Sequence, residues 1–108
     1  MSYVLSFSEQ PDEIWTLANR HTDWFIEELT KDLSDTRLKE FIIASTYYQG
    51  LGFNPGMDQQ KNLIVAYLNH LQKQLPDIID KSIIFENMAL TTHLKKLQEL
   101  VNNHIPFN

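Results

Sequence analysis

Four histidines have the most specific chemistry to offer, because imidazole is a frequent metal ligand and an effective base near neutral pH. No His-x3-His or Glu-x-x-His pair occurs, although a di-metal site in a helical bundle needs the second motif twice. A histidine on an apolar stripe usually bonds one ring nitrogen to the backbone. The spacing therefore favours structural histidines, and we expect no metal or other cofactor; the four are His21, His70, His93 and His104.

Paired carboxylates could instead support acid–base chemistry. Asp23 and Glu27 are four residues apart, and Glu28 follows Glu27 directly. A general acid or base needs a carboxyl group whose pKa is raised by burial in a cleft, and these acids are expected on an outer face. The nucleophile elbow and the phosphate-binding glycine loop are absent, and Gly50-x-Gly52 lacks the third glycine of a dinucleotide fingerprint. We therefore predict that the protein is not an enzyme.

The charge of the chain is concentrated near its amino-terminal end. Residues 1–35 have eight acids and two bases, a net charge of -6, whereas residues 36–108 have six acids and seven bases, which gives +1. Contacts to phosphate require clustered Lys and Arg, so nucleic acids and anionic membranes are not expected partners. The acidic third is interpreted either as a docking face for a cationic partner or as a solvated face that aids solubility.

The elements that must position these residues are predicted to be helices. Tyr3, Leu5 and Phe7 alternate and predict a short extended segment, which lacks a partner strand. Pro11 and two acids then fit the first turn of a helix capped by Ser8. Apolar residues at helical spacing continue that helix from Ile14 through Leu29, with a possible break near 21–22 where Thr22 could cap a second helix.

Four further helical segments and one loop complete the predicted bundle. A second helix capped by Asp35 or Ser34 runs to Tyr48, which is assigned to its inner face with Leu38 and Ile42. A loop follows over 50–56, a third helix over 57–75, and a short, strongly buried segment over 77–85 after Pro76. The last helix begins at Thr91 or Thr92 and ends before Pro106. The prediction is an all-α fold, a compact irregular bundle of about five helices with a short extended N-terminal segment.

One domain over residues 1–108 is expected, because no repeat or linker interrupts the chain. The first residues resemble no signal peptide, and the most apolar stretch is interrupted by charges and cannot span a bilayer. Together with the absence of cysteine, this predicts a cytoplasmic protein that is monomeric when free.

A second candidate surface is aromatic. Glu40, Ile43 and Tyr47 share the outward face of the second predicted helix, and the 50–56 loop presents Phe53 nearby. Exposed tyrosyl and apolar side chains are typical of protein-binding patches. The alternative interpretation is that Ile43 and Tyr47 pack beneath the N-terminal segment. The full set of predicted partner-binding residues is Asp12, Glu13, Asp23, Glu27, Glu28, Glu40, Ile43, Tyr47 and Phe53.

An acidic face beside an aromatic patch predicts a basic protein partner, and nucleases are basic because they bind phosphate. In length, acidity and lack of catalytic motifs, the chain resembles the immunity proteins of bacterial contact-dependent growth inhibition and related polymorphic toxin systems. The resemblance implies stoichiometric neutralisation of a cognate toxin domain. Tyr47-Tyr48 resembles the paired tyrosines of colicin-nuclease immunity proteins, but Gln49-Gly50 follows instead of that family's proline and acidic run, so that assignment is not transferred.

Two other functions stay open at this point. The first is a helical adaptor or regulatory module that holds proteins together without inhibiting them. The second is a small-ligand-binding or enzymatic domain, with a pocket lined by His21, Trp24 and His93. A deep polar pocket would favour this last alternative.

Overall fold

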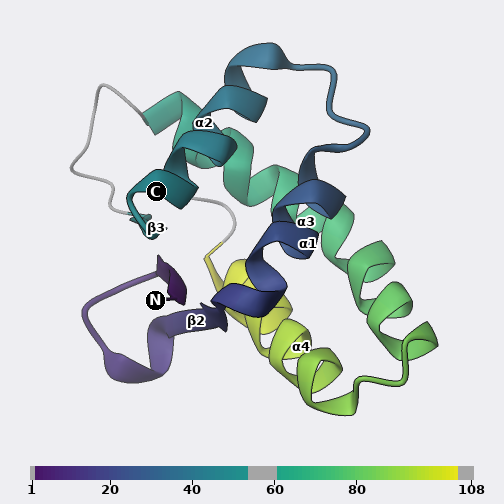
Figure 1. Cartoon of the computed structure of the whole chain (residues 1–108). Coiled ribbons are helices and arrows are strands. Elements are labelled where there is room, and N and C mark those ends of the chain that lie inside the picture. The colour runs from purple at the N-terminus through teal and green to yellow at the C-terminus, as the bar shows by residue number, and fades with distance from the viewer. Residues whose placement is uncertain (1, 54–60, 105–108) are drawn as a thin grey trace.

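The computed structural model describes residues 2–53 and 61–104 (Figure 1). In the described residues a three-stranded sheet packs with four α-helices. The strands are β1 (Ser2–Ser6), β2 (Ile14–Ala18) and β3 (Gly50–Gly52), and a short 3-10 helix (Pro11–Glu13) precedes β2. The helices are α1 (Asn19–Thr30), α2 (Thr36–Tyr47), α3 (Lys61–Ile84) and α4 (Met88–Asn103).

The sheet contradicts the prediction of an all-α bundle of about five helices. Its strand order is β2-β1-β3, with β2 antiparallel and β3 parallel to the central β1. The extended N-terminal segment therefore does have partners. On the inner face Tyr3 and Leu5 are buried beside their register partners Leu17 and Trp15.

Residues 14–18 were assigned to a helix because five residues are too few to distinguish the helical period of about 3.6 residues from the strand period of two. Ile14, Ala18, Phe25 and Leu29 do recur at helical spacing, but Trp15 and Leu17 alternate with exposed Ile14 and Thr16 as in a strand with one buried face. Pairing with β1 favours the strand, since it satisfies the backbone hydrogen bonds of both segments and buries the rings of Tyr3 and Trp15. Helix α1 then begins at Asn19, before the expected break.

Helix α3 also differs from prediction, because it continues through Pro76 instead of ending there. Proline removes one helical N–H but not the rest of the ladder, and Pro76 is exposed, so water can satisfy the freed carbonyl group. Residues 77–85 are therefore mostly the end of one long helix. Figure 1 shows α3 and α4 as a helical hairpin whose turn lies at one end of the molecule.

The helix termini confirm one predicted cap, correct another, and change the position of Tyr48. Asp35 caps α2, where its Oδ1 accepts a hydrogen bond of 3.1 Å from Leu38 N. Asn87 caps α4 in the same way through Leu90 N, so the helix begins before Thr91. Tyr48 lies outside α2 with an exposed side chain, although it was predicted to face inward.

The core is formed where α3 meets the other helices and the sheet. All five predicted inward residues of the third helix are buried, as are the four of the last helix: Ile64, Tyr67, Leu68, Leu71, Leu75, Leu94, Leu97, Leu100 and Val101. Within the described chain, every buried side-chain nitrogen and oxygen has a hydrogen-bond partner. No helix in these ranges has a stretch long and apolar enough to cross a membrane.

Candidate functional site

The outer face of α1 displays the acidic residues that the sequence predicted there. Asp23 and Glu27 are both exposed, one helical turn apart. Asp12 is exposed on the 3-10 helix that precedes β2. Among the described residues none forms an ion pair with these three carboxylates. They therefore remain available to a cation from outside the chain.

Two predicted acidic residues are instead engaged within the protein. Glu28 accepts a hydrogen bond of 2.5 Å from Lys81 Nζ, which joins α1 to α3, and pairs at 2.9 Å with Lys31 Nζ at the end of its own helix. Burial disfavours ionisation of Glu28, but the two ammonium groups outweigh it and lower its pKa. Glu13 accepts from Ser8 Oγ at 2.7 Å and lies 3.2 Å from His104 Nε2. Both residues are half-buried, so they hold the fold together and offer little to a partner.

The predicted aromatic surface is confirmed for α2 but not for the following loop. Tyr47 is 80% exposed, and Ile43 and Glu40 are exposed on the same helix, so the N-terminal segment does not cover them. Phe53 is only 3% exposed, because its ring packs 4.9 Å from that of Phe7 and its backbone N–H bonds to Ser6 O. Phe53 was expected on a loop, whereas the chain there follows β3 into the core.

An apolar surface that the sequence did not predict lies at the turn between α3 and α4. Ile84 is 75% exposed, Phe85 64% and Met88 68%, and Ile83 is also exposed. Residues 77–85 were expected to be the most buried segment because they are apolar on nearly all sides. The structure buries only Ile78, Ile79 and Ser82, since a single helix cannot turn every side toward the core.

The apolar turn and the acidic helix form one continuous surface. The ring of Trp24 on α1 packs edge-on against that of Phe85, with 6.1 Å between centroids. Asp23 and Glu27 are exposed on the same helix as Trp24. Asp80 and Glu86 are exposed on the α3 side, so carboxylates lie near the apolar residues. We define the docking surface as Asp23, Trp24, Glu27, Ile84, Phe85 and Met88. One sequence signal could have identified this surface: a run of apolar residues, flanked by charged ones, at the end of a helix that contains a proline.

Three of the four histidines bond a ring nitrogen to a backbone carbonyl group, the pattern expected of histidines beside an apolar face. His70 Nε2 bonds to Leu29 O at 2.5 Å, and His104 Nδ1 to Leu100 O at 2.8 Å. His93 bonds through Nε2 to Thr16 O and stacks on Trp15, with 4.8 Å between rings. In the described ranges no group of three histidine, cysteine or acidic residues could hold a metal ion.

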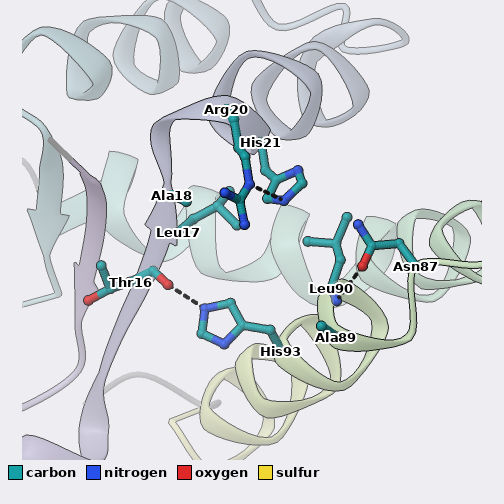
Figure 2. Close-up of a pocket in the computed structure, with 9 residues that line it drawn as sticks. All are labelled: Thr16, Leu17, Ala18, Arg20, His21, Asn87, Ala89, Leu90 and His93. Atoms are coloured by element: carbon teal, nitrogen blue, oxygen red, sulfur yellow. Dashed lines mark hydrogen bonds between the residues drawn. The ribbon is translucent and has the colours of Figure 1, made fainter.

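His21 differs from the other histidines, because its recorded bond is to a side chain: Nε2 accepts from Arg20 Nε at 3.3 Å. His21 and His93 line the same pocket, between the end of β2, the start of α1 and the start of α4 (Figure 2). Trp24, which was expected beside them, belongs to the docking surface instead.

Comparison of the chain with protein-family models, with curated proteins and with solved structures finds no match.

Proposed function

We propose that this protein is an inhibitory binding partner, an immunity protein that neutralises a basic, nuclease-type toxin domain through the docking surface. The observation that supports the proposal is the continuity between exposed, unpaired carboxylates on α1 and exposed apolar side chains at the α3–α4 turn. A cytoplasmic location of the free, monomeric protein belongs to the same proposal.

The arrangement matches what a specific protein interface requires. Interfaces bury an apolar centre, often aromatic, inside a polar rim that sets orientation and partner choice. Ile84, Phe85 and Met88 would supply the centre. Asp23 and Glu27 would supply the rim. Exposed apolar groups of this size are costly in a monomer and are used where a partner covers them.

The charge pattern favours a cationic partner over an uncharged one. Asp23 and Glu27 lie within one helical turn, and a chain with a net charge of -5 attracts a basic protein over a distance of about 10 Å at moderate ionic strength. Electrostatic attraction then accelerates association, while burial of the apolar centre slows dissociation. A toxin active site that binds phosphate would present the complementary positive potential.

The proposal is tested by capturing the partner and then measuring inhibition. The full-length protein is purified from its native cell with what it binds, the co-purifying protein is identified by mass spectrometry, and its activity is assayed alone and with added protein. We expect a basic protein whose nuclease activity disappears at a 1:1 ratio. A partner that keeps full activity when saturated would contradict inhibition and favour an adaptor.

Variants locate the surface within that assay. Replacing Ile84 and Met88 together by Ser should weaken binding by about 2 kcal/mol or more, because both side chains lie at the apolar centre, while stability stays nearly unchanged because both are exposed. Tyr47→Ala is the matched control on α2. If Tyr47→Ala weakens binding and the double variant does not, the partner docks on the aromatic surface of α2 instead.

A further inference from the structure

The pocket beside the docking surface has chemistry of its own. It is a cavity of about 420 Å³, within the usual size range for small-ligand sites. Figure 2 shows Arg20 and His21 on one side of it, His93 on the opposite side, and Asn87 with Leu90 at its end. Three separate elements, β2, α1 and α4, thus contribute to one concave site.

Three polar side chains of this pocket offer hydrogen-bond donors, whereas His93 donates a hydrogen bond from Nε2 to Thr16 O and has an acceptor at Nδ1 when its ring is neutral. Arg20 uses Nε to bond His21, which leaves both of its terminal nitrogens without an acceptor among the described residues. Asn87 uses its side-chain oxygen to cap α4 through Leu90 N at 3.1 Å, so its amide N–H groups are left to face outward. Because His21 Nε2 accepts a hydrogen bond, the neutral ring has its proton on Nδ1, which is a further donor.

The electrostatics of the lining are opposite to those of the whole chain. The protein has 14 acidic residues and a net charge of -5, yet no acidic side chain is among the described residues that line this pocket. Arginine presents paired N–H groups whose geometry matches the two oxygens of a carboxylate or phosphate. The lining is therefore suited to an anion.

Part of the pocket wall is apolar, formed by Leu17, Ala18, Ala89 and Leu90. An inorganic ion would leave this wall in contact with water, whereas a short hydrocarbon chain would cover it. We propose that the pocket binds a small organic anion, with its oxyanion group on Arg20 and Asn87 and a short apolar part against Leu90. This site is independent of the proposed function, because it requires no protein partner.

The test is a titration of the full chain, followed by two-dimensional amide NMR, with butyrate, acetate, butyramide and inorganic phosphate. We expect butyrate to shift the signals of residues 16–21 and 87–93 saturably and to bind up to about tenfold tighter than acetate, because two more methylene groups are buried. Neutral butyramide should bind far more weakly. Equal binding of butyrate and butyramide would overturn the proposal, and so would phosphate binding tighter than butyrate.

Arginine variants provide the matched control, since the chain has two arginines, Arg20 and Arg37. Both are exposed, and Arg37 lies on α2 outside the pocket lining, so either change to Gln removes one charge without disturbing the core. Arg20→Gln should weaken butyrate binding at least about fivefold, and Arg37→Gln should not. Equal losses would show unspecific attraction and overturn the site. The proposal would also be overturned if the wild type bound no butyrate while Arg20→Gln lost binding to the protein partner. That result would assign the pocket to a side chain of the partner.

Discussion

Replacing Tyr3 by Phe should destabilise the protein more than replacing Tyr67, although the two hydroxyls bond to each other at 2.8 Å. Ser45 Oγ donates its only proton to Ile42 O at 2.5 Å, so the 2.7 Å bond between Tyr3 and Ser45 must use the proton of Tyr3. Tyr67 must then donate to Tyr3. The protons run in one direction, from α3 through β1 to α2.

The direction of these hydrogen bonds sets the expected loss of stability in each variant. Tyr3→Phe removes two hydrogen bonds and leaves the fully buried Tyr67 hydroxyl without an acceptor, so we expect a loss of about 2–4 kcal/mol. Tyr67→Phe removes one bond and leaves no donor unpaired, which should cost about 1 kcal/mol. In the double variant no hydroxyl is orphaned, so its loss should be smaller than the sum by about 1 kcal/mol or more.

Urea unfolding of the four proteins, followed by far-ultraviolet circular dichroism, measures the cycle. Additive losses, or a larger loss for Tyr67→Phe than for Tyr3→Phe, would refute the proton order.

The same pair predicts a loss of stability in alkali. Burial raises the pKa of Tyr3, and it raises that of Tyr67 well above the ordinary value. Since ionisation then favours the unfolded chain, whose tyrosines titrate near pH 10, this contribution is complete below about pH 10 and is lost as the pH rises toward the folded pKa values. The free energy of unfolding should therefore decrease less steeply above pH 10 in the double variant than in the wild type.

Three further changes test the fold around the site. Gly50→Ala should cost about 3 kcal/mol or more in urea unfolding, because Gly50 has φ +143° and an added Cβ would lie 1.9 Å from Val4 O; Gly52→Ala, with open space at that point, should be nearly neutral. Glu28→Gln should cost about 1 kcal/mol at pH 7, and the difference from wild type should vanish as the pH falls through the lowered pKa of Glu28. Pro76→Ala should stabilise by about 2 kcal/mol, because it restores an N–H inside α3, and an unchanged or lower melting temperature would contradict a helix that runs through this residue.

Local signals in the sequence predicted the helical part of the fold well. The inward faces of the third and last helices follow directly from apolar residues at 3.6-residue spacing, and Asp35 precedes its helix as a typical cap. Exposure of Asp23 and Glu27 was predictable for the same reason, because the opposite face of α1 is apolar.

The first strand was predicted as an extended segment, but the pairing of the strands was not predictable, since it depends on contacts distant in sequence. Strand β3 is three residues long and contains two glycines, so its propensity is poor. It forms because β1 offers an unpaired edge and because Gly50, without a side chain, can approach Val4 closely. Phe53 follows it into the core, which explains why a residue expected on a loop is buried.

The apolar part of the docking surface was missed for a different reason. Composition alone indicated that residues 77–85 were buried, but burial depends on how many neighbours surround a helix. Helix α3 contacts α4 and α1, and these two neighbours leave Ile84 and Phe85 mostly exposed, although the ring of Phe85 touches Trp24. The ion pair of Glu28 was equally unpredictable, because its partner Lys81 lies 53 residues away in the sequence.

Association kinetics with the captured partner test the central claim most directly. Asp23→Lys with Glu27→Lys changes the net charge from -5 to -1 on the face proposed to attract a basic protein. The association rate constant should fall at least about tenfold at low ionic strength, and its dependence on salt should flatten, whereas Glu28→Gln should leave both nearly unchanged. Equal rate constants and equal salt slopes for the charge-reversed and wild-type proteins would show that this face does not receive the partner.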